Sequence, residues 1–231
     1  MSYSIMITAS FIKSHPKIDF IKSVIESLKY INMKDDIPII LAHDFSDHPN
    51  FLQYIQNLKK YIIDKPTIKL IVRESHGHLT GNVRNAFQYI NTEYVLIIQH
   101  DLPFVNYFDI HKVIEDMKNN PELKHVRFNK RKNIKAVSDA LNDLFGKQIN
   151  SINYTYTRTP SWSDQNHLCL SEYYRNIILK ECSDGTFMEN YLIKRSVNED
   201  IHSKYGTYLF GKLNEDAYIN HTDARKNISL K

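Results

Sequence analysis

Two aspartates stand directly after strand-like apolar runs and have side chains suited to binding a cation or a ligand. Asp101 follows the run Tyr94-Val95-Leu96-Ile97-Ile98, and Asp44 follows the run that ends at Ala42. Carboxylate oxygens are the ligands that Mg²⁺ and Mn²⁺ prefer, and they accept hydrogen bonds from bound molecules. Asp101 is therefore the first candidate for a metal-binding residue in this chain.

The residues before Asp101 predict the scaffold that positions these groups. Apolar runs typical of strands alternate with segments in which apolar residues recur at the helical period. The predicted strands are Ile5–Ile7, Ile37–Ala42, Ile68–Val72 and Tyr94–Ile98, and the helices between them run from Ile18 to Tyr30, Phe51 to Ile62 and Val83 to Ile90. Strands that are apolar on both faces require a parallel sheet covered by helices. We expect an α/β/α sandwich with a mainly parallel central sheet and a ligand crevice at the carboxyl ends of its strands.

Beyond Asp101 the pattern changes. We predict a helix at Ile110–Met117, a short strand at His125–Phe128, a helix at Ile134–Phe145, and an aromatic, polar and irregular segment from Asn150 onwards. The 231 residues contain no internal repeat or linker, so a single domain is expected.

The polar groups at the predicted strand ends make the chain resemble the GT-A glycosyltransferases, and among them the inverting family-2 enzymes. The resemblance follows the order of elements over residues 3–105 and is loose over 106–225. It implies a Rossmann-like GT-A fold in which residues 1–105 bind a nucleotide sugar and residues 106–231 bind the acceptor. In that family an Asp after the second strand hydrogen-bonds the nucleotide base, and Asp44 has the matching position. The alternative is that Asp44 starts a turn or caps the next helix.

The family also has a glycine-containing loop followed by an Arg-Asn pair near the phosphates, which Gly81-Asn82-Val83-Arg84-Asn85-Ala86 resembles. The alternative is that Arg84 is a solvated helix residue. The resemblance implies a donor-binding set made of Ala9, Ser10, Phe11, Asp44, Arg84, Gln99 and His100.

The family's metal motif, Asp-x-Asp after the fourth strand, corresponds here to Gln99-His100-Asp101, so the first carboxylate has become an amide. One carboxylate suffices for Mn²⁺ or Mg²⁺ when phosphates and waters complete the coordination. Several GT-A branches return a His from the C-terminal region to the cation, and His221 is the candidate for it. The alternative readings are that Asp101 begins a turn before Pro103 and that His221 is a surface or core residue.

The acceptor is expected at the loop that carries the only Trp of the chain. Trp162, Ser163, Asp164 and Gln165 combine an aromatic face for stacking on a sugar with polar groups for its hydroxyls. Trp162 is alternatively a core residue. Inverting transfer needs a carboxylate base, for which Glu189 is the first choice and Asp164 the second. Glu189 is alternatively a polar residue on the exposed side of a helix, and a retaining enzyme needs neither base.

Composition argues against several other classes of protein. The net charge is only +4, and the longest basic cluster is Lys130-Arg131-Lys132, which disfavours a nucleic-acid partner. Cys169 and Cys182 are too few for a disulfide framework. The sequence shows neither a signal-peptide pattern nor a stretch apolar enough to span a membrane, so we expect a cytoplasmic protein.

The sequence therefore predicts a metal-assisted glycosyltransferase that moves a hexosyl or N-acetylhexosaminyl group from a UDP- or GDP-sugar to a glycan or small acceptor. Two other hypotheses stay open. One is a nucleotidyltransferase that makes nucleotide sugars, although Ser10-Phe11-Ile12-Lys13 lacks the glycines of that class. The other is a non-catalytic carbohydrate-binding relative, which the missing first carboxylate favours. The sequence leaves the oligomeric state open.

Overall fold

One continuous sheet forms the centre of the computed structural model, which describes residues 2–134, 145–160, 162–192 and 199–222. Within these residues nine strands lie in the order β3-β2-β1-β4-β8-β5-β9-β7-β6. The strands are β1 (Tyr3–Ala9), β2 (Ile39–His43), β3 (Ile68–Val72), β4 (Tyr94–Gln99), β5 (His125–Arg127), β6 (Gln148–Asn150), β7 (Thr155–Arg158), β8 (His167–Leu170) and β9 (Thr207–Phe210).

The first four strands are all parallel, as the alternation of strands and helices requires. β1 lies between β2 and β4, with Ala9 opposite His43 and Thr8 opposite Gln99. Beyond β4 the sheet becomes mixed, because β8 runs antiparallel to both β4 and β5, and β7 runs antiparallel to β9. The carboxyl ends of β1 to β4 therefore share one edge, where a ligand crevice is expected.

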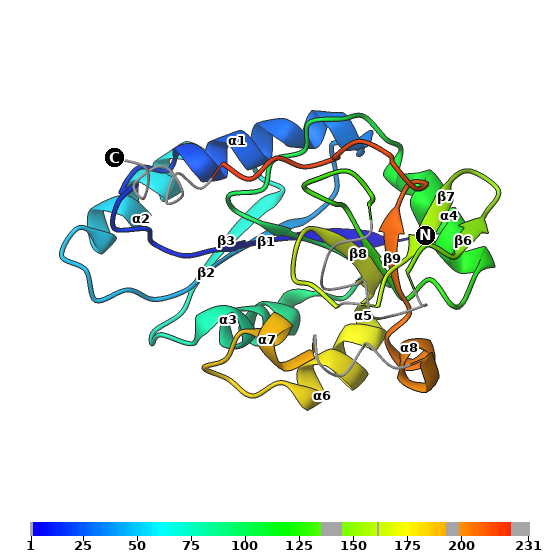
Figure 1. The fold of residues 1–231 in the computed structure, drawn as a ribbon. Helices are drawn as coiled ribbons and strands as arrows, with labels where there is room; N and C mark the ends of the chain where they lie inside the picture. The colour runs from blue at the N-terminus through cyan, green and yellow to red at the C-terminus, as the bar shows by residue number, and fades with distance from the viewer. Residues whose placement is uncertain (1, 135–144, 161, 193–198, 223–231) are drawn as a thin grey trace, which may run out of the picture.

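Helices cover both faces of the sheet, so the molecule has three layers (Figure 1). On one face lie α1 (Asp19–Ser27), α2 (Phe51–Ile62) and α4 (Ile110–Asn119). On the other face lie α3 (His78–Ala86), α5 (Ser171–Tyr173), α6 (Leu179–Glu181) and α7 (Met188–Leu192), with α8 (Glu199–Tyr205) at the margin. Short 3-10 turns continue α1 at Leu28–Ile31 and α3 at Phe87–Tyr89, and a π-helical turn at Tyr174–Ile178 joins α5 to α6.

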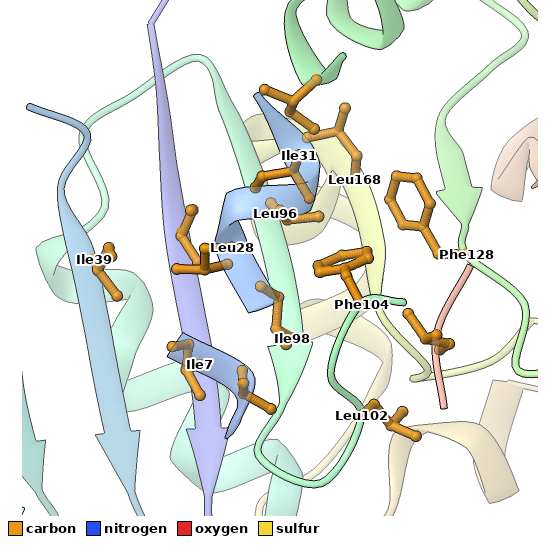
Figure 2. Packing of buried hydrophobic residues seen from close by; sticks show 14 of the residues in the cluster. Ile7, Leu28, Ile31, Ile39, Leu96, Ile98, Leu102, Phe104, Phe128 and Leu168 are labelled. Atoms are coloured by element: carbon orange, nitrogen blue, oxygen red, sulfur yellow. The ribbon is translucent and has the colours of Figure 1, made fainter. Parts of the chain in front are cut away.

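Alternate residues of each central strand belong to two different cores. Ile7 of β1 packs in the core that includes α1, α2 and α4, whereas Met6 packs in the core that includes α3 and α7. Both side chains are fully buried, which is why the runs read as apolar on both faces. Figure 2 shows part of the first core, where Leu96 and Ile98 of β4 lie beside Leu28 and Phe104.

The structure confirms the expected α/β/α sandwich and the four predicted strands. It differs from the sequence analysis after Asn150, where β7, β8, α5 to α7 and β9 stand in place of an irregular segment. These elements are short, and short strands carry too few residues to show a clear period. The helix predicted at 134–145 falls almost entirely outside the described residues. No helix in the described part of the chain is both long and apolar enough to cross a membrane.

Candidate active site

A pocket of about 290 Å³ lies at the carboxyl ends of the parallel strands. The end of β1, the loops after β2, β3 and β4, and two later segments supply its walls. Its lining residues are Thr8, Ala9, Ser10, Asp44, His76, His78, Leu79, Asn82, Gln99, His100, Asp101, Asp164 and Phe187. Five predicted donor-binding residues are in this set, namely Ala9, Ser10, Asp44, Gln99 and His100.

Backbone hydrogen bonds beyond the ladder tie the strand ends together around the pocket. The Asp44 amide donates to the Ala9 carbonyl at 2.9 Å, and the His100 amide donates to the Thr8 carbonyl at 2.9 Å. Asn82 of α3 adds a side-chain link, because its Nδ2 donates to the Ala42 carbonyl at 2.8 Å. The loops that carry the candidate residues are thus fixed to the sheet rather than independent of it.

Asp44 is buried and accepts hydrogen bonds from two loops. Its Oδ1 accepts from the Phe45 amide at 3.0 Å and from the Gly77 amide at 2.9 Å. Its Oδ2 lies 2.9 Å from Nδ1 of His76. This carboxylate therefore joins the loop after β2 to the loop after β3, and it faces the pocket at the same time.

Arg73, which the sequence analysis did not single out, supports the Asp44 side of the pocket. Its Nε lies 3.6 Å from Oδ1 of Asp44, and its Nη1 donates to the Gly81 carbonyl at 2.6 Å. The guanidinium passes close to Gly77, where an added Cβ would lie 2.6 Å from it. Gly77 is needed for this close approach. Arg73 and Gly77 are four positions apart in a polar segment, and that spacing did not indicate the contact.

Asp101 and His221 come together although 120 positions separate them in the chain, with Nε2 of His221 3.2 Å from Oδ2 of Asp101. Thr222 fixes the C-terminal segment here, because its amide and its hydroxyl both donate to the Asp101 carbonyl at 3.0 Å. Oδ1 of Asp101 is buried and has no hydrogen-bond partner among the described residues. Within those residues no group of three or more His, Cys, Asp or Glu side chains is arranged to hold a metal ion.

Gln99 contacts Asp164, which comes from the loop before β8. The Nε2 of Gln99 donates to the Asp164 carbonyl at 2.8 Å and to its Oδ1 at 3.1 Å. Burial, together with the nearby Glu189 carboxylate, raises the pKa of Asp164 to about 7. The two predicted base candidates are therefore neighbours, but of the two only Asp164 lines the pocket.

His43 at the end of β2 is fully buried beside Asp44 and does not line the pocket. Its Nδ1 donates to the Asp44 carbonyl at 2.7 Å, and the ring packs against Phe51 and Tyr54 of α2. Burial lowers the pKa of His43 to about 4, so the imidazole is neutral at physiological pH. It is a structural group of the β2 end.

Some predicted site residues lie elsewhere. Phe11 lies in an adjoining hollow that shares Ser10 and His76 with the pocket, and it packs against His48 at 4.9 Å between ring centroids. Arg84 is outside the pocket lining, because its guanidinium binds Asp184 at 2.7 Å and the carbonyls of Leu179 and Cys182.

Trp162 does not offer a stacking face to an acceptor. Its ring is fully buried and packs against His125 and His167, so Trp162 is a core residue. Ser163 is buried as well, and Gln165 is half-buried with its amide directed to the Ser163 hydroxyl at 3.3 Å. Neither of the two lines the pocket, and their acceptor roles stay predictions.

Six lining residues were not assigned a role from the sequence, namely Thr8, His76, His78, Leu79, Asn82 and Phe187. His78 and Phe187 form part of an aromatic edge with ring centroids 5.5 Å apart, and His76 lies 4.3 Å from His78. Phe187 is 53% exposed. Asn82 is buried, and its Oδ1 has no partner among the described residues. The sequence signals for this wall are the His76-Gly77-His78 segment and the Gly81-Asn82 part of the family-like motif.

The model of "Glycosyl transferase family 2" matches residues 11–173 of the chain. No curated protein sequence matches the chain.

Several solved structures share the fold at low sequence identity. TarS residues 1–349 from S. aureus align with a TM-score of 0.57 and 16% identity over 99% of this chain and 63% of that one. The mannosyltransferase PcManGT from Pyrobaculum calidifontis, in complex with GDP-Man and Mn²⁺, aligns with a TM-score of 0.53 and 9% identity over 75% and 46%. A cytidylyltransferase from Leptospira borgpetersenii aligns with a TM-score of 0.54 and 12% identity over 94% and 79%. The chain thus spans less than two thirds of TarS 1–349 and less than half of PcManGT.

Proposed function

Because the chain belongs to glycosyl transferase family 2, we propose that it transfers a sugar from a UDP- or GDP-linked donor to a hydroxyl of a glycan or small acceptor. The transferred group is a hexosyl or N-acetylhexosaminyl unit. The observation that carries the proposal is the pocket at the strand ends, which gathers Asp44, Asp101 and Asp164. Solved relatives of similar fold include TarS in complex with UDP-GlcNAc and PcManGT in complex with GDP-Man.

The nucleoside is assigned to the Asp44 side. Ala9 and Ser10 line the pocket there, and Phe11 lines the adjoining hollow together with Phe45, the residue after Asp44. Oδ2 of Asp44 has His76 as its neighbour, a half-exposed side chain that a ligand can displace or join. A base with an N–H donor satisfies this carboxylate as well as the histidine does.

A divalent cation, Mn²⁺ or Mg²⁺, is assigned to Asp101 and His221. The described lining of the pocket contains three carboxylates and neither Lys nor Arg, so a diphosphate in it requires added positive charge. The unpartnered Oδ1 of Asp101 and the adjacent imidazole are oxygen and nitrogen ligands that suit such an ion. When bound, the cation offsets the charge that develops on the departing nucleoside diphosphate.

The acceptor is assigned to the Asp164 side of the pocket. In an inverting reaction the acceptor oxygen bonds to the anomeric carbon while the bond from that carbon to the phosphate oxygen breaks. The electron pair of the broken bond leaves on the nucleoside diphosphate, and the hydroxyl proton passes to a carboxylate. We assign that carboxylate to Asp164, because it lines the pocket and a pKa of about 7 suits proton acceptance near neutral pH. Glu189 acts as its charged neighbour.

Thermal denaturation with nucleoside diphosphates tests the donor and metal assignments together. UDP or GDP is expected to raise the melting temperature only when Mn²⁺ or Mg²⁺ is present, because ligands that bind the folded state stabilise it. Asp101→Ala is expected to remove this stabilisation, and Asp216→Ala, at a carboxylate that is 75% exposed, serves as the matched control. A wild-type chain that neither nucleotide stabilises with either metal would contradict the proposal.

Nucleotidyl transfer is a second candidate, favoured by the cytidylyltransferase among the structures of similar fold. The two reactions release different products. A glycosyltransferase releases a nucleoside diphosphate from a nucleotide sugar, whereas a nucleotidyltransferase releases pyrophosphate from a nucleoside triphosphate and a sugar phosphate. A pyrophosphate assay with CTP or UTP and a hexose phosphate separates them, and sugar binding without either product indicates a non-catalytic relative.

A further inference from the structure

The side-chain amide of Gln99 hydrogen-bonds to Asp164, and this contact explains why an amide stands at position 99. Gln99 occupies the first position of the family's two-carboxylate motif, and both hydrogen bonds of its Nε2 go to Asp164. A carboxylate at position 99 would offer no donor to Asp164 and would place a second negative charge beside it. The departure from the motif and the presence of Asp164 in the pocket wall are thus linked by direct contact.

The surrounding contacts fix this pair in place. The backbone amide of Gln99 donates to Oδ1 of Asn166 at 3.0 Å, and Nδ2 of Asn166 donates to the Leu102 carbonyl at 2.7 Å. Asn166 is fully buried, and its carbonyl accepts from the Phe128 amide at 2.8 Å. The segment that carries Asp164 is therefore anchored at the ends of β4 and β5, the two neighbours of β8, and Gln99 completes the anchor at the carboxylate itself.

We propose that Gln99 is a positioning residue of the transfer reaction, whose amide holds the Asp164 carboxylate at the pocket wall in the orientation that accepts the proton of the acceptor hydroxyl. The inference rests on the proposed function, because the proton acceptor has a role only if transfer occurs. Donation from the amide also favours the charged form of Asp164. Glu189 raises the pKa of Asp164, whereas Lys130, like Gln99, lowers it.

The proposal predicts that restoring the family's motif damages this chain. Gln99→Asp adds a carboxylate, removes the donor and shortens the side chain, so proton acceptance by Asp164 is expected to need a higher pH. Gln99→Glu keeps the length and adds the charge, whereas Gln99→Leu removes the donor without adding charge. Gln88→Glu makes the same change of amide to carboxylate on an exposed residue outside the pocket lining.

The first measurement is the titration of the Asp164 carboxyl carbon by NMR, assigned by its loss in Asp164→Asn. The midpoint is expected to rise by about one pH unit in Gln99→Leu and further in Gln99→Glu, because each loses a donor and the second gains a like charge. Gln88→Glu is expected to leave it unchanged. Equal midpoints in the wild-type chain and both Gln99 variants would overturn the inference.

The second measurement is the pH dependence of donor turnover with UDP-GlcNAc or GDP-mannose and Mn²⁺, with water as the acceptor. The acid limb of kcat is expected to follow the NMR midpoint in each variant, while binding of UDP or GDP persists. An acid limb that stays in place while the midpoint moves would exclude Asp164 as the proton acceptor. A wild-type chain that binds no nucleoside diphosphate refutes the proposed function, even where the midpoint moves as expected.

Discussion

Asp44 and Asp101 are buried to nearly the same extent at the pocket but differ in how their oxygen atoms are satisfied. Their exposed fractions are 3% and 5%. Oδ1 of Asp44 accepts two backbone hydrogen bonds, whereas Oδ1 of Asp101 has no partner among the described residues. A buried polar atom without a partner costs free energy that the folded chain recovers only when something binds it. Asp44 therefore links two loops of the scaffold as well as lining the pocket, whereas Asp101 lines the pocket with an unpartnered Oδ1.

The largest expected effect compares the stability of two alanine variants. Asp44→Ala leaves the buried Gly77 amide without an acceptor and removes one partner each of Arg73 and His76. We expect it to lower the free energy of unfolding by about 3 kcal/mol, whereas Asp101→Ala changes it by less than about 1 kcal/mol. Urea denaturation without ligands measures both. An equal loss in the two variants would remove the distinction between scaffold and site.

The same contrast explains how much of the site the sequence predicted. Asp44 and Asp101 stand at the ends of long apolar strands, and their position follows from strand order alone. The contact between Gln99 and Asp164 joins residues that are 65 positions apart and depends on β8 entering the sheet between β4 and β5. No local pattern encodes that insertion. Residue types predicted both members of the pair as site residues without indicating that they touch.

Trp162 shows a second limit of sequence reasoning. Polar neighbours suggested an exposed ring, but those neighbours hydrogen-bond within the protein, as the Gln165 amide does with Ser163. A polar residue beside an aromatic one is therefore weak evidence of exposure. The fold was more predictable than the site, because periodicity reports which face of an element is buried, whereas a site depends on contacts between distant loops.

The pH dependence of stability is expected to have opposite signs for two buried groups, Asp164 in the pocket lining and His43 beside Asp44. The pKa of Asp164 is raised to about 7, so its contribution to stability is full below the unfolded value of 3.8 and is lost as pH rises through about 7. The pKa of His43 is lowered to about 4, so its contribution is present above 6.5 and is lost as pH falls through about 4.

Two variants isolate these contributions. Between about pH 5 and about pH 7, Asp164→Asn is expected to gain about 2 kcal/mol relative to the wild-type chain, since each pKa unit corresponds to about 1.4 kcal/mol. Over the same range His43→Gln is expected to lose a similar amount relative to wild type. Urea denaturation midpoints across this range measure both effects. If the stability of the two variants relative to wild type changed with pH in the same direction, the burial of one group or the other would be contradicted.

A pair of glycines tests the packing of Arg73 on the scaffold side. An added Cβ at Gly77 would lie 2.6 Å from the guanidinium, whereas at Gly81 it would lie 3.4 Å away. Gly77→Ala is expected to cost about 1 to 2 kcal/mol through the displaced Arg73. Gly81→Ala lies inside α3 and is expected to be neutral or stabilising by up to about 1 kcal/mol, because alanine favours the helix. If Gly81→Ala lowered the melting temperature more than Gly77→Ala did, Arg73 would not be held as described.

Phe187 gives the smallest expected effect on stability and a direct readout of where the donor sugar binds. Because its ring is 53% exposed, Phe187→Trp is expected to change the free energy of unfolding by less than about 0.5 kcal/mol. The chain's only Trp is fully buried, so the new indole becomes the exposed fluorophore. If Phe187 stacks on the sugar, UDP-GlcNAc or GDP-mannose with Mn²⁺ changes the emission more than UDP or GDP does. Tyr107→Trp, at a residue 62% exposed and outside the pocket lining, is the control, and an equal response in the two variants would place the sugar elsewhere.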